Sequence, residues 1–188
     1  MVAPFDAAEF RRTLGCLPTG VAVITTTGPS GAPVGMAANS FMSVSLDPPL
    51  VMLCVAHESA TLVDLRRSGT FCANVLAAEQ APLCQRFSLK GVDRFAGVPW
   101  TPSAAGPQLD DALARVSCSL QTEHVAGDHV ILVARVTALA VHPDEPAPLV
   151  FHRGRLGGFR EEPKPSARTW SPHRQGVGGS AWVSLAAG

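Results

Sequence analysis

The sequence predicts a mainly β protein, a closed or nearly closed antiparallel barrel with a few short helices at its periphery. Runs of β-branched and apolar residues recur along the chain and are separated by turn residues. We expect about six or seven strands but only two or three short helices, which does not fit a repeating βαβ pattern. The 188 residues suit one globular domain, and 46% hydrophobic with 16% charged residues excludes global disorder.

A short helix is expected first. Asp6 and Glu9 have the spacing of a capping box, in which each side chain bonds the other residue's backbone N–H. The turn residues Pro18-Thr-Gly stop this helix. Its apolar residues would share one face: Phe5, Phe10 and Leu14.

A β-hairpin should follow. The β-branched run 21–27 predicts a strand, 28–31 a turn and 32–41 the returning strand. Asp-Pro-Pro at 47–49 interrupts the chain. The wholly apolar run 50–55 then predicts a strand buried on both faces.

The rest of the chain continues the β pattern. Ser59 is placed as the N-cap of a helix that Gly69 ends. In order, we expect a helix over 59–67, a strand over 70–76, a short helix over 79–87, an irregular segment over 90–108, long β runs over 112–124 and 129–141 around a turn, and a last strand over 149–151.

The composition changes near residue 160. Beyond it the chain contains Glu-Glu-Pro-Lys-Pro-Ser and Gln-Gly-Val-Gly-Gly-Ser, which are typical of linkers. We therefore divide the chain into a domain over 1–159 and a flexible Gly/Pro/Ser-rich C-terminal tail over 160–188. Trp170 and Trp182 are the exceptions in the tail and could dock on a neighbouring surface or a partner.

Charge and cysteine usage narrow the function. Fifteen basic residues balance fifteen acidic ones, which argues against a nucleic-acid binder. The five cysteines form no Cys-x-x-Cys pair and the six histidines are scattered, so we expect no metal site and mostly buried thiols. With no basic start before a long apolar stretch, we expect no signal peptide, no membrane span and a cytoplasmic location.

Four loops carry polar groups, and each also has a purely structural interpretation. Gly35-Met-Ala-Ala-Asn-Ser offers small side chains to a flat ligand, or is a strand ending in a turn. Ser59-Ala-Thr begins a helix, where backbone N–H groups attract anions, or is an ordinary N-cap. Gly127-Asp-His is a site histidine or a hairpin turn. Arg94-Phe-Ala-Gly sets a cation beside an aromatic ring, or is a loop anchored by Phe95.

Together, these motifs resemble one family in their order and spacing. It is the short-chain flavin reductase family, the reductase components of two-component flavin-dependent monooxygenases. The resemblance runs from about residue 10 to 158 and rests on these segments: Thr19-Gly-Val-Ala-Val-Ile-Thr-Thr, Gly35-Met-Ala-Ala-Asn-Ser-Phe, Val44-Ser-Leu-Asp-Pro-Pro-Leu-Val, Ser59-Ala-Thr, Phe71-Cys-Ala-Asn-Val-Leu, Gln85-Arg-Phe, Asp93-Arg-Phe-Ala-Gly, Gly127-Asp-His and Leu149-Val-Phe-His-Arg-Gly.

The resemblance implies an FMN-binding split β-barrel, a homodimer, and NAD(P)H-dependent reduction of FMN or FAD. Reduced flavin would diffuse to a separate monooxygenase. By position, Asn39 and Ser40 would contact the isoalloxazine ring and Arg94 the phosphate or adenylate end. His129 would lie near the nicotinamide, as an orienting group because hydride transfer needs no acid or base. The other implied cofactor-binding residues are Met36, Ala37, Ala38, Ser59 and Thr61, where Ser59 and Thr61 hold the phosphate, and Phe95.

Ala37 departs from the family pattern, which often has Thr at this position. Loss of that hydroxyl removes a hydrogen bond near the ring, or indicates a reassigned pocket. The alternative function is therefore a split-barrel protein that binds flavin or a small metabolite without reducing flavin, or a repurposed catalyst in a biosynthetic pathway. A third hypothesis is a barrel that binds another large cofactor, such as haem or a deazaflavin. The sequence does not choose between FMN and FAD, or between NADH and NADPH.

Overall fold

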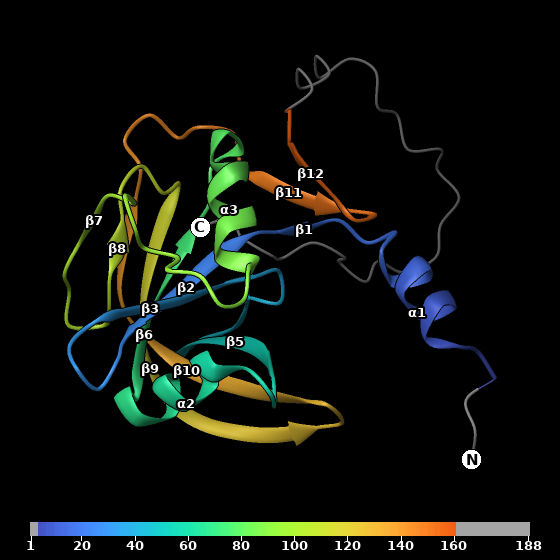
Figure 1. Cartoon of the computed structure of the whole chain (residues 1–188), viewed down its shortest axis with the longest axis horizontal. Helices are drawn as coiled ribbons and strands as arrows, with labels where there is room; N and C mark the ends of the chain where they lie inside the picture. Colours follow the sequence, from blue (N-terminus) through green and yellow to red (C-terminus); the bar gives the residue numbers. More distant parts are fainter. Residues whose placement is uncertain (1–3, 161–188) are drawn as a thin grey trace, which may run out of the picture.

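One seven-stranded antiparallel sheet, in the order β3-β2-β6-β9-β10-β5-β4, forms the body of the protein (Figure 1). The computed structural model describes residues 4–160. Because β3 and β4 are the two edges, the sheet does not close, and the mainly β, split-barrel prediction is confirmed. Its strands are β2 (Ala22–Thr27), β3 (Pro33–Ala38), β4 (Met42–Leu46), β5 (Pro49–Ala56), β6 (Thr70–Val75), β9 (Ala114–Ala126) and β10 (His129–Val141).

Two smaller sheets and the helices surround this body (Figure 1). One small sheet has the order β1-β11-β12 and the other pairs β7 with β8. The strands are β1 (Thr19–Gly20), β7 (Trp100–Thr101), β8 (Gln108–Leu109), β11 (Leu149–His152) and β12 (Arg155–Gly158). The helices are α1 (Ala7–Leu14), α2 (Ala60–Ser68), the 3-10 turn η1 (Ala78–Gln80) and α3 (Ala81–Ser88).

Two apolar clusters hold the sheet in place. Alternation along β2 divides its side chains between them, since Ile24 packs into the first cluster and Val23 into the second. α2 contributes Leu62 and Leu65 to the first cluster, and α3 contributes Phe87 to the second. The two helices therefore lie against opposite faces of the β2–β3 hairpin, which places the ends of both near β3.

The first helix forms as expected, but its apolar face does not pack. The Asp6 carboxylate accepts from the N–H groups of Ala8 and Glu9, and the Glu9 carboxylate accepts from the Asp6 N–H, so the capping box is complete. The helix ends at Leu14 instead of continuing to Pro18. None of its residues is buried, and Figure 1 shows α1 projecting away from the main sheet. Local capping signals predicted the helix, whereas its packing depends on tertiary contacts. Phe5, Phe10 and Leu14 are all exposed.

The prediction for the apolar run 50–55 was half right. β5 forms, but only Val51, Leu53 and Val55 are buried, while the alternate residues are half-buried. A central strand of an open sheet has one face on the core and one facing outward. β4 was not predicted, because its Met-Ser-Val-Ser-Leu sequence directly follows the hairpin. β12 was also missed, so β11 is not the last strand.

The expectation of mostly buried thiols is met. Cys72, Cys84 and Cys118 are buried. Desolvation raises the pKa of Cys72 to about 11 and that of Cys118 to about 12, so both thiols stay protonated near neutral pH.

Between residues 4 and 160, no helix is long and apolar enough to cross a membrane. The predicted tail, with Trp170 and Trp182, lies almost entirely beyond the described residues.

Candidate active site

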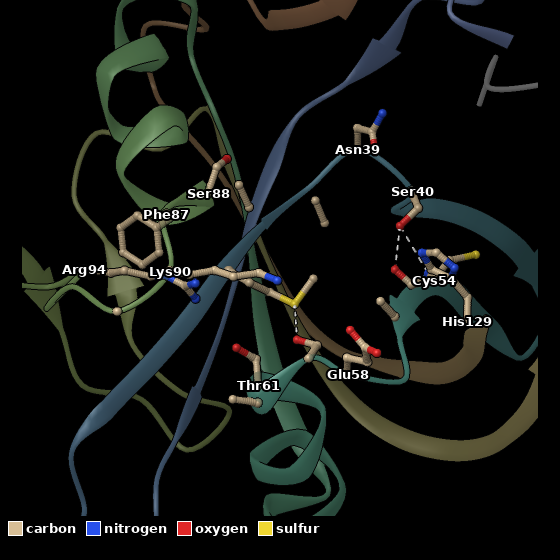
Figure 2. Close-up of a pocket in the computed structure, with 17 residues that line it drawn as sticks. Asn39, Ser40, Cys54, Glu58, Thr61, Phe87, Ser88, Lys90, Arg94 and His129 are labelled. Atoms are coloured by element: carbon tan, nitrogen blue, oxygen red, sulfur yellow. Dashed lines mark hydrogen bonds between the residues drawn. The ribbon is translucent and has the colours of Figure 1, made fainter. Parts of the chain in front are cut away.

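A pocket of about 630 Å³ lies beside edge strand β3 (Figure 2). Its walls come from β3, the beginning of α2, the end of α3 with the loop that follows, and the neighbouring ends of β5 and β10. Segments far apart in the sequence therefore meet here. The predicted site residues that line it are Met36, Ala37, Ala38, Asn39, Ser40, Ser59, Thr61, Arg94 and His129.

β3 presents backbone groups to this pocket. It pairs with β2 on one side only, so every second residue has its N–H and C=O groups directed outward. Gly35 is one of these residues, because its carbonyl oxygen accepts from Arg94. By the same alternation Ala37 also directs its backbone outward. The small side chains of Ala37 and Ala38 leave the strand accessible to a flat ligand.

Ser40 connects the two sides of the barrel opening. Its hydroxyl donates to the carbonyl oxygen of Cys54 at 3.0 Å and accepts from the Cys54 N–H at 3.2 Å. Ser40 follows β3 and Cys54 belongs to β5, so this pair joins strands that the sheet leaves unpaired (Figure 2). The Ser40 hydroxyl therefore shapes the pocket wall, while the neighbouring Asn39 side chain is exposed and free to meet a ligand.

The beginning of α2 forms the lower side of the pocket in Figure 2. Ser59 is the N-cap by position, as predicted, but its hydroxyl makes no capping bond and lies 3.6 Å from the sulfur of Met36. Thr61 is only 3% exposed yet lines the pocket. The first-turn N–H groups of a helix lack intrahelical partners, and no acidic residue occupies this turn. Together with the helix dipole, this end favours an anion.

The loop after α3 adds positive charge. Lys90, Gly91 and Arg94 line the pocket, with Lys90 exposed and Arg94 half-buried. Sequence reasoning identified Arg94 but missed Lys90, whose only signal was its place in the same glycine-containing loop. One acidic side chain, Glu58, lines the pocket as well.

Phe95 does not line the pocket. Its side chain lies in the second apolar cluster, where its ring makes edge contacts with Phe87 at 5.0 Å and Trp100 at 6.1 Å between centroids. Its expected role as a direct ligand contact is therefore not supported by its position. The alternative interpretation, a loop anchored by Phe95, describes what it does.

His129 stands at the opposite side of the pocket from Arg94 (Figure 2). It begins β10 directly after the predicted turn and pairs with Ala56 of β5. Its Nδ1 lies 2.8 Å from the carboxylate of Asp128. This hydrogen bond, followed by the charge of His129, lowers the pKa of Asp128 below its usual value.

Several other lining residues were not predicted as site residues from the sequence. They are small, apolar or isolated polar side chains whose role depends on the fold: Cys54, Ala56, Glu58, Ala60, Phe87, Ser88, Lys90 and Gly91. Within the part of the chain that the structure describes, no three His, Cys, Asp or Glu side chains gather as a metal site. The pocket therefore joins a helix end and two cationic side chains, a combination that favours an anion, to the exposed edge of β3.

The family profile described as "Flavin reductase like domain" matches residues 14–160. The chain belongs to this family. The match covers the whole sheet and every residue of the pocket. The family expected from the sequence motifs is thereby confirmed, and with it the expected class of enzyme, an NAD(P)H:flavin oxidoreductase.

Similar proteins support this flavin reductase-like assignment. The "Flavin-dependent monooxygenase, reductase subunit HsaB" of Rhodococcus jostii (strain RHA1) is 44% identical over 158 residues, 84% of this chain and 80% of that protein. The structure of nitrilotriacetate monooxygenase component B from Mycobacterium thermoresistibile superposes with a TM-score of 0.80 at 38% identity, covering 86% of this chain and 93% of that one.

A second similar structure is a complex with ligands. It is the Streptomyces globisporus C-1027 NADH:FAD oxidoreductase SgcE6 in complex with NAD and FAD fragments. It superposes with a TM-score of 0.79 at 34% identity, covering 88% of this chain and 99% of that one. At this level of similarity the two chains share the fold over nearly the whole barrel.

Proposed function

We propose that this protein reduces FMN or FAD with NADH or NADPH in the β3 pocket and releases reduced flavin to a separate monooxygenase. The observation that carries the proposal is the joining of an outward-facing strand edge to an anion-binding helix end in one pocket. The family assignment supports the class of enzyme, and the residues that line the pocket are those we assign to flavin binding.

The residues present fit a flavin phosphate ester. A pocket of about 630 Å³ lies within the usual range for cofactor sites. Its β3 edge, with the backbone of Ala37 directed outward, suits the polar rim of a flat ring. The beginning of α2 and the Lys90 ammonium suit a phosphate group. Thr61, buried at this end, is the hydroxyl we assign to the phosphate together with Ser59.

The reaction moves a hydride from nicotinamide C4 to the flavin and takes up one proton, giving NAD(P)⁺ and reduced flavin. No amino acid side chain carries a hydride well, so the flavin supplies this chemistry when bound and the protein supplies binding and orientation. In this role β3 holds the ring and His129 orients the nicotinamide. These contacts must bring nicotinamide C4 to about 3–3.5 Å from the flavin atom that accepts the hydride.

A separate oxygenase is the partner we propose. The Rhodococcus relative is named as a reductase subunit of a flavin-dependent monooxygenase, and the Mycobacterium structure as component B of nitrilotriacetate monooxygenase. Other relatives are named simply as flavin reductases, such as one from Pseudomonas putida. Transfer by diffusion suits the pocket, whose Lys90 and Asn39 sides are exposed to solvent.

Oxidation of NADH at 340 nm, with and without added FMN or FAD, tests this function. We expect turnover that depends on free flavin, with NADPH compared in parallel. If neither flavin supports oxidation of either nicotinamide, the reductase assignment fails. Retained flavin binding would then favour the alternative of a non-reducing flavin-binding barrel, which the visible spectrum and a flavin titration identify.

We also propose that the protein is a homodimer. Met42, Met52 and Val133 pair across β4, β5 and β10 and so share the outward face of the sheet. Met42 is exposed, and nearby Leu46 is 95% exposed. Burying such an apolar row stabilises a dimer. Light scattering after size-exclusion chromatography should give twice the chain mass, and Met52→Glu should give the monomer mass.

A further inference from the structure

Arg94 lines the phosphate side of the pocket, but two of the five N–H donors of its guanidinium already bond backbone carbonyl groups. Its Nε donates to the carbonyl oxygen of Leu89 at 2.7 Å, and one of its terminal nitrogens donates to that of Gly35 at 2.6 Å. Both distances are short for N–H···O bonds, as expected when the donor is charged. A side chain held in this way at two points has little freedom to follow a ligand.

These two bonds join the loop to the strand. Leu89 begins the loop after α3, and Gly35 lies on β3 at the pocket edge. Arg94 therefore closes a short ring of chain that contains Lys90 and Gly91, and ties that ring to β3. Figure 2 shows the Lys90 side chain extending into the pocket from this loop, while the Arg94 head group remains against β3.

Gly35 is suited to this connection. A Cβ built there would lie 2.9 Å from the ring of Phe87 and 3.1 Å from the backbone oxygen of Ile24. Only glycine lets α3 approach β3 this closely, and the approach brings the Gly35 carbonyl within reach of Arg94. The motif Gly35-Met-Ala-Ala-Asn-Ser therefore has a structural function at its first residue.

The far side of Arg94 is fixed as well. The Asp93 carboxylate accepts from the N–H groups of Phe95 and Ala96 at 3.0 and 3.2 Å. The Phe95 ring is buried against Phe87 and Trp100. The loop thus has a rigid base at residues 93–96, and Arg94 transmits that rigidity to the exposed segment with Lys90.

From this geometry we infer that Arg94 is a positioning residue and that Lys90 is the cation that binds the flavin phosphate. The inference rests on the proposed function, and it reassigns the role that the family resemblance implied for Arg94. Lys90 has no hydrogen bond or ion pair among the described residues, so its ammonium is free for a ligand. Arg94 acts on the phosphate only by holding the loop that carries Lys90.

A double-mutant cycle separates the two roles. The measured quantity is the ratio of the dissociation constant of riboflavin, which lacks the phosphate, to that of FMN, from quenching of flavin fluorescence. We expect Lys90→Ala to lower this ratio about tenfold. Arg94→Lys should lower it similarly, because an ammonium lacks the rigid planar fork with which the guanidinium holds the two carbonyl groups. Combining the two substitutions should lower it no further.

The opposite results are equally clear. If the double variant shows the product of the two single effects, Arg94 binds the phosphate independently, and the inference is wrong. An unchanged ratio in Arg94→Lys also overturns it. A wild-type ratio near one would instead refute the phosphate site of the proposed function itself.

A matched control excludes a general effect on folding. Arg67 also donates from its guanidinium to a backbone carbonyl, that of Thr27 at 2.8 Å, but it lies on α2 outside the pocket. Arg67→Lys should leave the ratio unchanged. Thermal melting of each variant checks that the folded protein is being compared, and Arg94→Gln, which keeps one donor group, provides a second variant if Arg94→Lys is unstable.

Discussion

The imidazole of His129 and the carboxylate of Asp128 form a hydrogen bond of 2.8 Å at the turn between β9 and β10. Asp128 is almost fully exposed and His129 is half-buried at the pocket. When Nδ1 donates to the carboxylate, the Nε2 side of the ring is left for the ligand. The turn thus fixes the orientation of the one histidine that lines the pocket.

Replacing His129 with Ala should impair the use of NADH more than the binding of flavin. We expect kcat/KM for NADH to fall about tenfold, as for the loss of one oriented polar contact, while the dissociation constant of FMN changes less than twofold. Steady-state kinetics and fluorescence titration measure the two quantities. Equal losses in both would place His129 against the flavin instead of the nicotinamide.

The pKa of Asp128 provides a test of the same pair by titration. His129 holds this pKa below its usual value, so the pair is intact above the unfolded pKa near 4 and is lost as pH falls through the lower folded value. NMR titration of the Asp128 carboxyl carbon should show this low midpoint. In His129→Ala the midpoint should return upward, and an unmoved midpoint would contradict the assignment.

The phosphate contribution of Lys90 should depend on salt. An exposed ammonium is screened over about 10 Å at 0.1 M ionic strength and about 3 Å at 1 M. The preference of the wild-type protein for FMN over riboflavin should therefore shrink between these salt concentrations. Lys90→Arg should keep the preference, and Arg11→Ala, which removes an exposed charge from α1, should not change it.

Asn74, in the Phe71-Cys-Ala-Asn-Val-Leu segment, has a structural role and does not line the pocket. It is 0% exposed, its Oδ1 accepts from the Leu109 N–H at 2.8 Å, and its Nδ2 donates to the Val23 carbonyl at 3.1 Å. Asn74→Ala leaves these groups unpaired and should lower the free energy of unfolding by about 2–4 kcal/mol in urea denaturation. Asn39→Ala, an exposed matched control, should cost less than about 0.5 kcal/mol.

Most of the fold could be predicted because its signals are local. The alternation in β2, the αL glycine Gly69 that ends α2, and the turn at Gly127 are all determined by neighbouring residues. β4 and β12 were missed because their pairing partners decide whether such short segments become strands. The exposure of Phe10 depends on what packs against α1, and the spacing of apolar residues in a helix does not reveal its packing partner.

The sequence motifs identified most of the residues that meet in the pocket, but not those whose position depends on contacts within a loop. Asn39, Thr61 and His129 line one pocket although they lie on different elements. Phe95 was assigned to the ligand through the Arg94-Phe-Ala-Gly motif of the resemblance, yet consecutive residues of a loop point in different directions. Lys90 was missed for the complementary reason, since only the fold of the loop directs it into the pocket.

Ala37, where the family often has Thr, should weaken flavin binding in this protein. Its backbone faces outward at the pocket edge and its side chain is half-buried. Ala37→Thr restores a hydroxyl beside the proposed ring, and one net hydrogen bond of about 0.5–1.5 kcal/mol should tighten FMN about two- to tenfold. Ala37→Val, which has the same shape without the hydroxyl, should not tighten it.

Flavin that binds more tightly should also be released more slowly, so turnover with free FMN should fall in Ala37→Thr if release limits the rate. Equal FMN affinities for the Thr and Val variants would show that the missing hydroxyl plays no part in flavin exchange.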